Sequence, residues 1–397
     1  MPYKYSPISY NGPGKQLPRI SHTPICRKLS LKMLILLFII VCYAYIYVIK
    51  NTDSVKTMKY ILIWTADDCY PFSTWKIGQN SFVEEKCPVS NCFIMSRRNL
   101  SMDLKKFDAV AFNGRNLPSR RGYFDKPLRR YDHQRYIYFH TESSDNYPIC
   151  NPIFDAFFNW TATYKLDSDV VYSYISIRDV AGNEVGPRLD MKWLHPMTGV
   201  NDASGNKTKA VAWFVSNCAT GSRREIYAGD LDLALRKYRL KIDQFGACGS
   251  LKCNRSDNNC NKMLNDYYFY LSFENSFAED YVTEKVLTPL QNNNVPIVYG
   301  GANYSRFLPP GSYLDATKHS PKELAAIIAY LIGNPDLYNM FFRWRNHYSY
   351  YTLDTVCKLC AALNNDALTK KRKVYHQLRR WWNSDYEKRC EEGMYNI

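Results

Sequence analysis

The sequence has no low-complexity tract, no internal repeat and no recognisable motif for binding RNA or DNA. A formal net charge of +15 would otherwise suggest a nucleic-acid partner. The charge is unevenly spread, however: the first 32 residues contain basic residues and no acidic one, and a second basic run covers 370–373 with Arg379 and Arg380. We interpret the second run as a solvated face and expect no nucleic-acid partner.

Charge is also absent from Met33–Ile49, an apolar run between two lysines. The run is slightly short for a bilayer span, which needs about 20 residues. Its basic flank lies upstream, which predicts a cytosolic N-terminus and a lumenal remainder. A cleaved signal peptide is the alternative, but no small-residue cleavage site follows. We therefore expect a cytosolic tail at 1–32, a transmembrane signal anchor at 33–49 and a stem at 50–59.

No second CxxC and no spaced histidine pair accompanies Cys357 and Cys360, which argues against a zinc site. Eleven of the 13 cysteines lie beyond the apolar run. A lumenal compartment favours disulfides, and the odd number leaves at least one thiol unpaired within the chain. Glycosylation sequons also suit that compartment. The candidates are Asn99, Asn206, Asn254 and Asn303, whereas Asn159, in an aromatic run, is the least suitable.

Apolar runs alternate with helical patterns, which is typical of doubly wound parallel α/β sheets. Ser320, Pro321 and Glu323 form a capping box that begins one of the helices. Polar residues 199–209 suggest a linker between two such domains. We expect domains at 60–200 and 201–350 and a final segment at 351–397. The expected strands are 60–64, 109–112, 136–139, 210–216, 268–273 and 295–299; the expected helices include 223–238 and 281–292.

The most informative stretch is Phe269-Tyr-Leu-Ser-Phe-Glu-Asn-Ser276, followed by Asp280-Tyr-Val-Thr-Glu-Lys285. A buried strand leads into a polar turn, and such turns bind anions in open α/β sheets. Lys285 in a first helical turn opposes the helix dipole, and a bound diphosphate would explain its position. The alternative, that Glu284 and Lys285 are ordinary surface charges, stays open at this point.

This stretch resembles the signature of the alpha-1,3-fucosyltransferases, glycosyltransferase family ten. The resemblance covers about 60–363 and includes Gln134–Ser143, Phe158–Tyr164 and Phe214–Asn217. Residues 245–253 look most like the invertebrate and plant branch that fucosylates the N-glycan core.

The family implies a GT-B fold, in which an N-terminal acceptor domain and a C-terminal GDP-fucose domain face a cleft. It implies inverting transfer of fucose from GDP-fucose, in alpha-1,3 linkage, to a GlcNAc of a glycoprotein glycan in the Golgi lumen. The N-glycan core GlcNAc is the first expectation for the acceptor, and outer lactosamine or LacdiNAc is the alternative. An inactive, lectin-like scaffold is a more distant alternative. No cofactor is required, and stimulation by Mn²⁺ or Mg²⁺ stays open.

The resemblance also implies roles for individual residues. Glu142 matches the proposed catalytic base, although the neighbouring His140 is either a rival base or a support for it. Lys285 and Arg224 should bind the pyrophosphate, with Arg223 as the fallback. Donor-pocket roles fall to Asn275, Tyr281 and Glu284, the last near the ribose or the oxocarbenium charge.

No metal site is expected. Two aspartate pairs nevertheless resemble metal-binding DxD motifs, Asp230 with Asp232 and Asp167 with Asp169. A helical pattern accounts for the first pair, and the second belongs to a family block.

In GT-B folds the end of the chain returns to the first domain. The resemblance therefore implies that Cys357 and Cys360 bond to cysteines near the start of the lumenal part, or to each other. The N-terminal candidates are Cys69, Cys87 and Cys92.

Overall fold

The computed structural model describes residues 35–43, 57–97, 102–199, 202–203, 205, 207–253, 258–352 and 355–391. The chain divides into two compact units, 1–56 and 57–397. In the first, residues 35–43 are helical. No helix within the described ranges is long and apolar enough to cross a membrane. The predicted tail, the ends of the predicted span and most of the stem lie outside these ranges.

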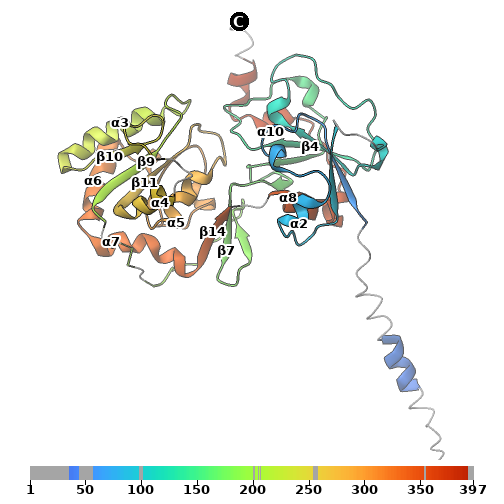
Figure 1. Ribbon diagram of the computed structural model, residues 1–397, viewed down its shortest axis with the longest axis horizontal. Helices are drawn as coiled ribbons and strands as arrows, with labels where there is room; N and C mark the ends of the chain where they lie inside the picture. Colours follow the sequence, from blue (N-terminus) through green and yellow to red (C-terminus); the bar gives the residue numbers. More distant parts are fainter. Residues whose placement is uncertain are drawn as a thin grey trace, which may run out of the picture. The chain divides into compact units, whose positions relative to one another are not determined.

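The second unit contains two parallel sheets and one small antiparallel sheet (Figure 1). The first sheet has six strands in the order β2-β1-β3-β4-β5-β6, all parallel. Its strands are β1 Lys59–Ile63, β2 Cys92–Ser96, β3 Ala109–Asn113, β4 Arg135–His140, β5 Trp160–Thr163 and β6 Val170–Val171.

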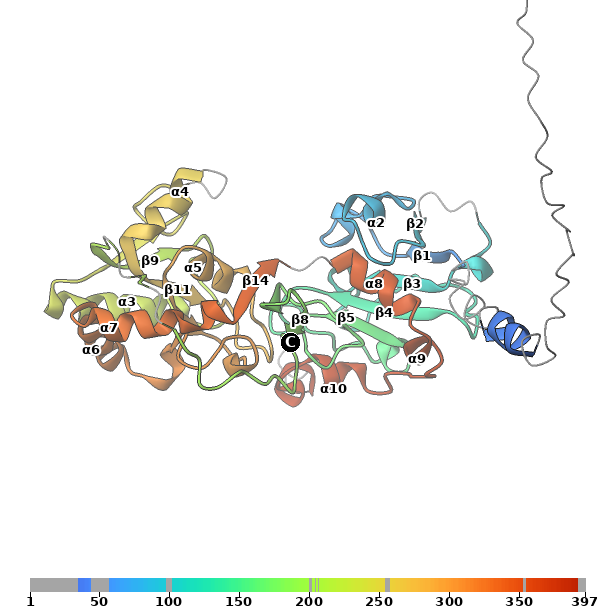
Figure 2. The same ribbon diagram turned by 90° about the horizontal axis from the view of Figure 1, so that it is seen from below.

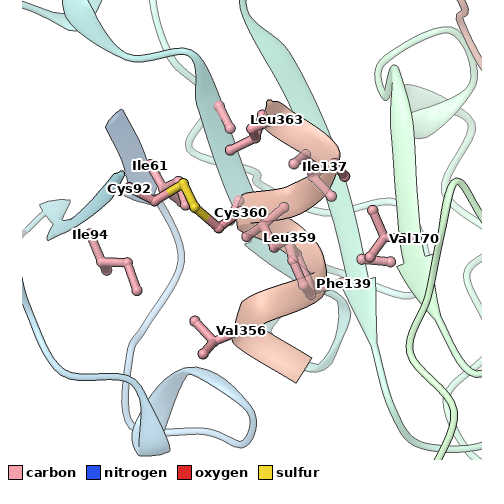
Figure 3. Packing of buried hydrophobic residues seen from close by; sticks show 14 of the residues in the cluster. Ile61, Cys92, Ile94, Ile137, Phe139, Val170, Val356, Leu359, Cys360 and Leu363 are labelled. Carbon is pink, nitrogen blue, oxygen red and sulfur yellow. A yellow bond between two sulfur atoms is a disulfide. The ribbon is translucent and has the colours of Figure 1, made fainter. Parts of the chain in front are cut away.

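Both faces of this sheet are buried, as expected for parallel strands. Ile61, Ile137 and Phe139 face helix α8 (Thr355–Leu363), which packs on them through Leu359 (Figure 3). The alternate strand residues form the other core with helix α10 (Leu378–Trp382). Figure 2 shows α8 and α10 on opposite sides of β4 and β5. Both helices come from the end of the chain, so the last segment completes the first domain.

The second sheet has five parallel strands in the order β10-β9-β11-β12-β13. Helices α3 (Arg224–Leu235) and α6 (Pro321–Ile332) pack on one face through Leu231, Leu324 and Ile328 (Figure 1). The predicted capping box begins α6: Ser320 accepts from the Glu323 amide, and Glu323 accepts from the Ser320 amide. The strands are β9 Lys209–Phe214, β10 Ile242–Phe245, β11 Tyr267–Phe273, β12 Val295–Tyr299 and β13 Leu314–Asp315.

A three-stranded antiparallel sheet completes the set of sheets, with β14 (Tyr348–Thr352) paired to β7 (Ile175–Asp179), and β7 to β8 (Glu184–Gly186). The remaining helices of five or more residues are α2 Asn80–Glu84, α4 Asn258–Met263, α5 Leu287–Gln291 and α7 Pro335–Asn339. The short α9 is Asp366–Thr369, and the main 3₁₀ segments are η6 Arg236–Tyr238, η8 Glu284–Val286 and η11 Met340–Asn346.

Five disulfides join cysteines of the described residues. Cys87 bonds to Cys357, and Cys92 bonds to Cys360 (Figure 3), so the CxxC is tied to the N-terminal cysteines rather than to itself. Including Cys69 among the disulfide candidates was wrong, because it remains a thiol. The other bonds are Cys150–Cys390, Cys218–Cys248 and Cys253–Cys260.

Candidate functional site

The strand order of the second sheet places an opening for a ligand between β9 and β11. From β9 the chain crosses to β10 on one side, and from β11 it crosses to β12 on the other. The chain therefore leaves the neighbouring strands β9 and β11 in opposite directions. Ligands of open α/β sheets bind at this point, beyond the carboxyl ends of the strands. Here the two loops meet: the Ser222 amide donates to the Asn275 carbonyl at 3.3 Å, and its hydroxyl donates to the Glu274 carbonyl at 2.8 Å.

Arg224 lies at this junction as the first residue of α3 and is 4% exposed. Its guanidinium donates to the carbonyl of Phe273 at 2.6 Å and to that of Asn217 at 3.2 Å. The side chain therefore ties together the ends of β9 and β11. Arg223, the fallback for the pyrophosphate role, is exposed and has a left-handed backbone with φ 53°.

Lys285 is not an ordinary surface charge. Its ammonium lies 3.0 Å from the carboxylate of Glu274 and donates to the Thr283 hydroxyl at 2.7 Å. Glu274 is 0% exposed and also accepts from the amide and hydroxyl of Thr283, each at 2.9 Å. A buried carboxylate needs such a cation. Lys285 is therefore held at the end of β11 by a charge on the strand itself.

Glu274, the buried partner of Lys285, is a candidate site residue that was not expected from the sequence. The signal was present, because Glu274 directly follows the buried strand Tyr267–Phe273 in the Phe-Glu-Asn-Ser motif. The expected helix start at Tyr281 was also wrong. The first helical turn begins at Glu284, since Asp280 has a left-handed φ of 56° and Thr283 is extended.

Glu284 is exposed and lies 3.8 Å from Lys285. With Lys285 it lines a cavity of about 170 Å³ that also includes Phe214, Tyr270 and Thr288. The side-chain oxygen of Asn275 is buried and accepts no hydrogen bond from the described residues. The cavity thus offers a cation and a carboxylate beside two aromatic rings, and the loop after β11 adds an unused acceptor.

Glu142 lies just past the carboxyl end of β4, at the corresponding edge of the first sheet. Its amide donates to Nδ1 of His140 at 3.1 Å. His140 is 1% exposed and packs between the rings of Tyr147 and Trp382. His140 is therefore a support for the Glu142 backbone rather than an open base.

The loop that contains Glu142 contacts the loop after β11 directly. The hydroxyl of Tyr281 donates to Oε2 of Glu142 at 3.3 Å, and Ser276 donates to Ser143 at 2.5 Å. Burial raises the pKa of Tyr281, so its hydroxyl keeps the proton that it donates. The pKa of Tyr174 is raised by burial and then by the charge of Glu142, followed by those of Glu284 and Glu274. The Tyr174 hydroxyl itself donates to the carbonyl of Thr141, the residue before Glu142, at 2.6 Å.

The C-terminal segment fixes the same loop from the other side. Trp382 donates to the Tyr147 carbonyl at 2.9 Å, and Arg389 forms an ion pair with Asp145 at 2.7 Å. Asp145 in turn accepts from the Phe277 amide at 3.2 Å. The Cys150–Cys390 disulfide closes this arrangement. Asp145 thus joins the end of the chain to the loop after β11.

The pH dependence of stability should report the burial of His140. Burial, followed by the charge of Arg115, lowers its pKa from 6.5 to about 3. Below pH 6.5 His140 binds a proton in the unfolded chain but stays neutral in the folded chain. The free energy of unfolding therefore falls as the pH falls towards 3. The slope of the free energy of unfolding reaches at most about 1.4 kcal/mol per pH unit.

A His140→Asn variant keeps an acceptor for the Glu142 amide. Its free energy of unfolding, measured with urea, should decline less steeply between pH 6.5 and 4. Equal slopes would contradict this account.

The DxD-like pairs contact protein groups. Asp232 lies in α3 and pairs with Arg236 at 3.0 Å, whereas Asp169 pairs with Lys373 at 2.9 Å. Asp167 accepts from the indole of Trp381 at 2.7 Å. No cluster of three metal-ligating side chains occurs in the part of the chain that the structure describes.

Two sequons lie within the described ranges. Asn303 is exposed. Asn159 is 8% exposed, and its amide donates to the Lys373 carbonyl. Asn99, Asn206 and Asn254 lie outside the described residues.

Comparison with known proteins places the chain in a family. Residues 204–381 match the model of glycosyltransferase family 10 (fucosyltransferase) C-term, and 56–175 match the fucosyltransferase N-terminal model. Alpha-(1,3)-fucosyltransferase C of Drosophila melanogaster is 35% identical over 84% of this chain and 80% of its own length. Glycoprotein 3-alpha-L-fucosyltransferase A of the same species is 34% identical over 85% of this chain and 63% of its own length.

A crystal structure of alpha1,3-fucosyltransferase with GDP-fucose superposes with a TM-score of 0.51 at 14% identity, covering 82% of this chain and 94% of that one. This likeness supports a shared GT-B architecture, and it concerns the fold alone. The sequence matches carry the assignment: the chain belongs to glycosyltransferase family 10 and is a fucosyltransferase.

Proposed function

We propose that the protein is an inverting alpha-1,3-fucosyltransferase that moves fucose from GDP-fucose to a GlcNAc hydroxyl of a glycoprotein glycan. One contact carries the proposal: Tyr281, in the motif that contains the donor candidates, donates to Glu142, the candidate base on the other sheet. An inverting displacement needs a base on the acceptor side and charge stabilisation on the leaving-group side. The two loops supply these groups next to each other.

On the donor side, negative charge grows on the β-phosphate as the bond to fucose breaks. A fixed cation in a partly dry site stabilises that charge without reorganisation. Lys285 fits this role because Glu274 and Thr283 hold its ammonium in place. Arg224 adds a second positive charge at the end of β11, while Glu284 is available to the ribose or to the oxocarbenium-like sugar.

On the acceptor side, Glu142 takes the proton from the attacking hydroxyl. Its backbone is held by His140, and its carboxylate accepts one hydrogen bond from Tyr281. This leaves carboxylate lone pairs for the acceptor. Neither step assigns a role to a metal ion, and stimulation by Mn²⁺ or Mg²⁺ is measured by adding EDTA.

Release of GDP from GDP-fucose tests the reaction. A transferase releases GDP much faster with a glycan acceptor than without one, and the fucosylated glycan appears in equal amount. Binding of glycan with no release of GDP under either condition would instead support the lectin-like scaffold.

The N-glycan core GlcNAc is our proposed acceptor. Residues 245–253 resemble the branch with this specificity, and a relative at 34% identity is named a glycoprotein fucosyltransferase. A glycan array with the full-length protein in neutral detergent decides between the core and the outer antennae. Fucosylation of lactosamine or LacdiNAc, with unmodified core GlcNAc, would reverse the choice.

We also propose that Met33–Ile49 anchors the chain in the Golgi membrane as a single-pass type II protein with a lumenal catalytic part. The charge-free run, its basic upstream flank and the many disulfides support this topology. Protection of residues 57–397 from protease in intact vesicles would follow, together with glycans on exposed sequons such as Asn303. Digestion without detergent would contradict the orientation.

Lys285→Ala should weaken GDP binding by about 10- to 100-fold, because a charge-assisted contact to phosphate contributes roughly 1.5 to 3 kcal/mol. Calorimetric titration with GDP measures the change. Lys322→Ala is the matched control, because Lys322 is an exposed lysine at the start of another helix. Arg223→Ala and Arg224→Ala, compared in the same way, identify the second phosphate ligand. Unchanged GDP affinity in Lys285→Ala would remove Lys285 from the donor site.

A further inference from the structure

A second candidate site lies at the opposite edge of the first sheet. A cavity of about 430 Å³ opens beside Lys59 and Arg135, which begin β1 and β4. Parallel strands begin at one edge of a sheet and end at the other, so this cavity is separated from Glu142 by the length of β4. Six strand residues span about 20 Å. The cavity is therefore distinct from the proposed fucosyl-transfer site.

Positive charge predominates around this cavity. Its lining contains four cationic side chains, Lys59, Arg135, Lys370 and Arg372, against the carboxylates of Asp108 and Asp132. Lys59 pairs with Asp108 at 3.0 Å, and Lys370 pairs with Asp366 at 2.9 Å. No carboxylate of the described residues lies within ion-pair distance of Arg135 or Arg372.

Arg135 is a half-buried cation with neutral partners. Its guanidinium donates to the carbonyl of His133 at 3.2 Å, to that of Asp132 at 3.4 Å, and to that of Thr369. Burial lowers the pKa of Arg135, and the charge of Arg372 lowers it further. The two guanidinium groups therefore repel each other, and the one lining carboxylate without a lysine partner among the described residues, that of Asp132, lies beyond ion-pair distance of both.

We propose that this cavity binds an oxyanion, the phosphate or sulfate group of an ester, between the guanidinium groups of Arg135 and Arg372. A guanidinium presents parallel N–H donors that match two oxygens of such a group, and the negative charge of the group would offset the repulsion between the two cations. A lysine ammonium lacks this planar geometry, so the pair of arginines favours phosphate or sulfate over a simple halide.

Two sources of such a group fit the position of the cavity. Lys59 begins β1 about ten residues after the predicted membrane span ends, so a phospholipid headgroup is one source. A soluble phosphate or sulfate ester is the other. Both present anionic, unesterified oxygens to Arg135 and Arg372, and the experiment has one arm for each.

The test uses the full-length protein in neutral detergent with saturating GDP, which occupies the phosphate-binding part of the transferase site. Inorganic phosphate is added at 10 mM or less, against chloride of equal ionic strength, and the thermal midpoint is measured. We expect phosphate to raise the midpoint by at least about 2 °C more than chloride does, as binding to the folded state alone requires. Arg372→Gln should abolish this increment.

Lys371→Gln is the matched control. Lys371 is exposed, adjoins Arg372 and does not line the cavity, so its substitution should keep both the increment and fucosyl transfer. Since Arg372 is also exposed, and its charge repels that of Arg135, its substitution should not lower the midpoint without phosphate. The second arm replaces phosphate with micelles containing phosphatidylinositol. If the lipid raises the thermal midpoint at a concentration at which inorganic phosphate does not, the ligand is a phospholipid headgroup. If only inorganic phosphate raises the midpoint, the ligand is a soluble ester. Equal increments in wild type and Arg372→Gln, or none in either arm, would overturn the proposal.

Discussion

Glu142→Gln should lower the turnover of fucosyl transfer by at least about 100-fold, because a positioned base usually contributes that much or more. The substitution preserves size, and the amide oxygen of glutamine still accepts the hydrogen bond that Tyr281 donates to Glu142 at 3.3 Å. The loop should therefore keep its position while it loses the group that takes the acceptor proton. Turnover is measured as GDP release with saturating acceptor, and GDP-fucose affinity is measured by calorimetry.

The control for this variant is Glu279→Gln. Glu279 lies in the loop after β11, and its carboxylate is largely exposed and pairs with Lys165 at 3.1 Å. Lys165 is buried, but it also donates to the Trp381 carbonyl at 2.8 Å, and a glutamine at position 279 can still accept a hydrogen bond from it, so turnover should change less than about threefold. Near-normal turnover in Glu142→Gln would remove the residue from the catalytic role. Loss of GDP-fucose binding would instead assign Glu142 to the donor site.

The largest effect on stability should come from removing the Cys87–Cys357 and Cys92–Cys360 disulfides together. They close loops of 270 and 268 residues, so each closes almost the same loop as the other. In the loop-entropy model such a closure contributes about 5 kcal/mol. Most of that is kept while either bond remains. The quadruple Cys→Ala variant should therefore lose far more stability than the two double variants combined.

The measurement is urea unfolding of the wild type, the two double variants and the quadruple variant, all under non-reducing conditions. The Cys92→Ala/Cys360→Ala variant also loses two packed sulfur atoms, because both cysteines are fully buried, and this adds a local cost. Cys253→Ala/Cys260→Ala is the control, since that disulfide spans only seven residues. Additive losses across the series would reject the shared-loop explanation.

The sequence predicted the strands that are buried on both faces. β1, β3, β4, β9, β11 and β12 correspond to the expected apolar runs, because a parallel strand between two helical layers needs uniformly apolar side chains. It did not predict β14, which pairs with β7 across about 170 residues. That pairing depends on tertiary contacts, since β14 reads Tyr-Ser-Tyr-Tyr-Thr, with only Tyr350 buried, and gives no apolar pattern.

The candidate site was predicted unevenly for a related reason. Lys285 could be selected because a cation in the first turn of a helix is unfavourable by itself. Its partner Glu274 could not, because a glutamate after a strand is ordinary unless its burial is known. The late helix start at Glu284 likewise could not be predicted, because it follows from the left-handed backbone of Asp280 and the extended backbone of Thr283.

The long disulfides set an order of events during synthesis. Cys87, Cys92 and Cys150 find their partners only 270, 268 and 240 residues later. At about 5 to 20 residues per second, these thiols wait roughly 10 to 50 s. The five-stranded sheet, β9 to β13, has emerged in full before Cys357 does. The domain that is made first is thus completed last. A chain that stops before Cys357 lacks α8 and α10, the helices that cover the first sheet, and not merely a dispensable tail.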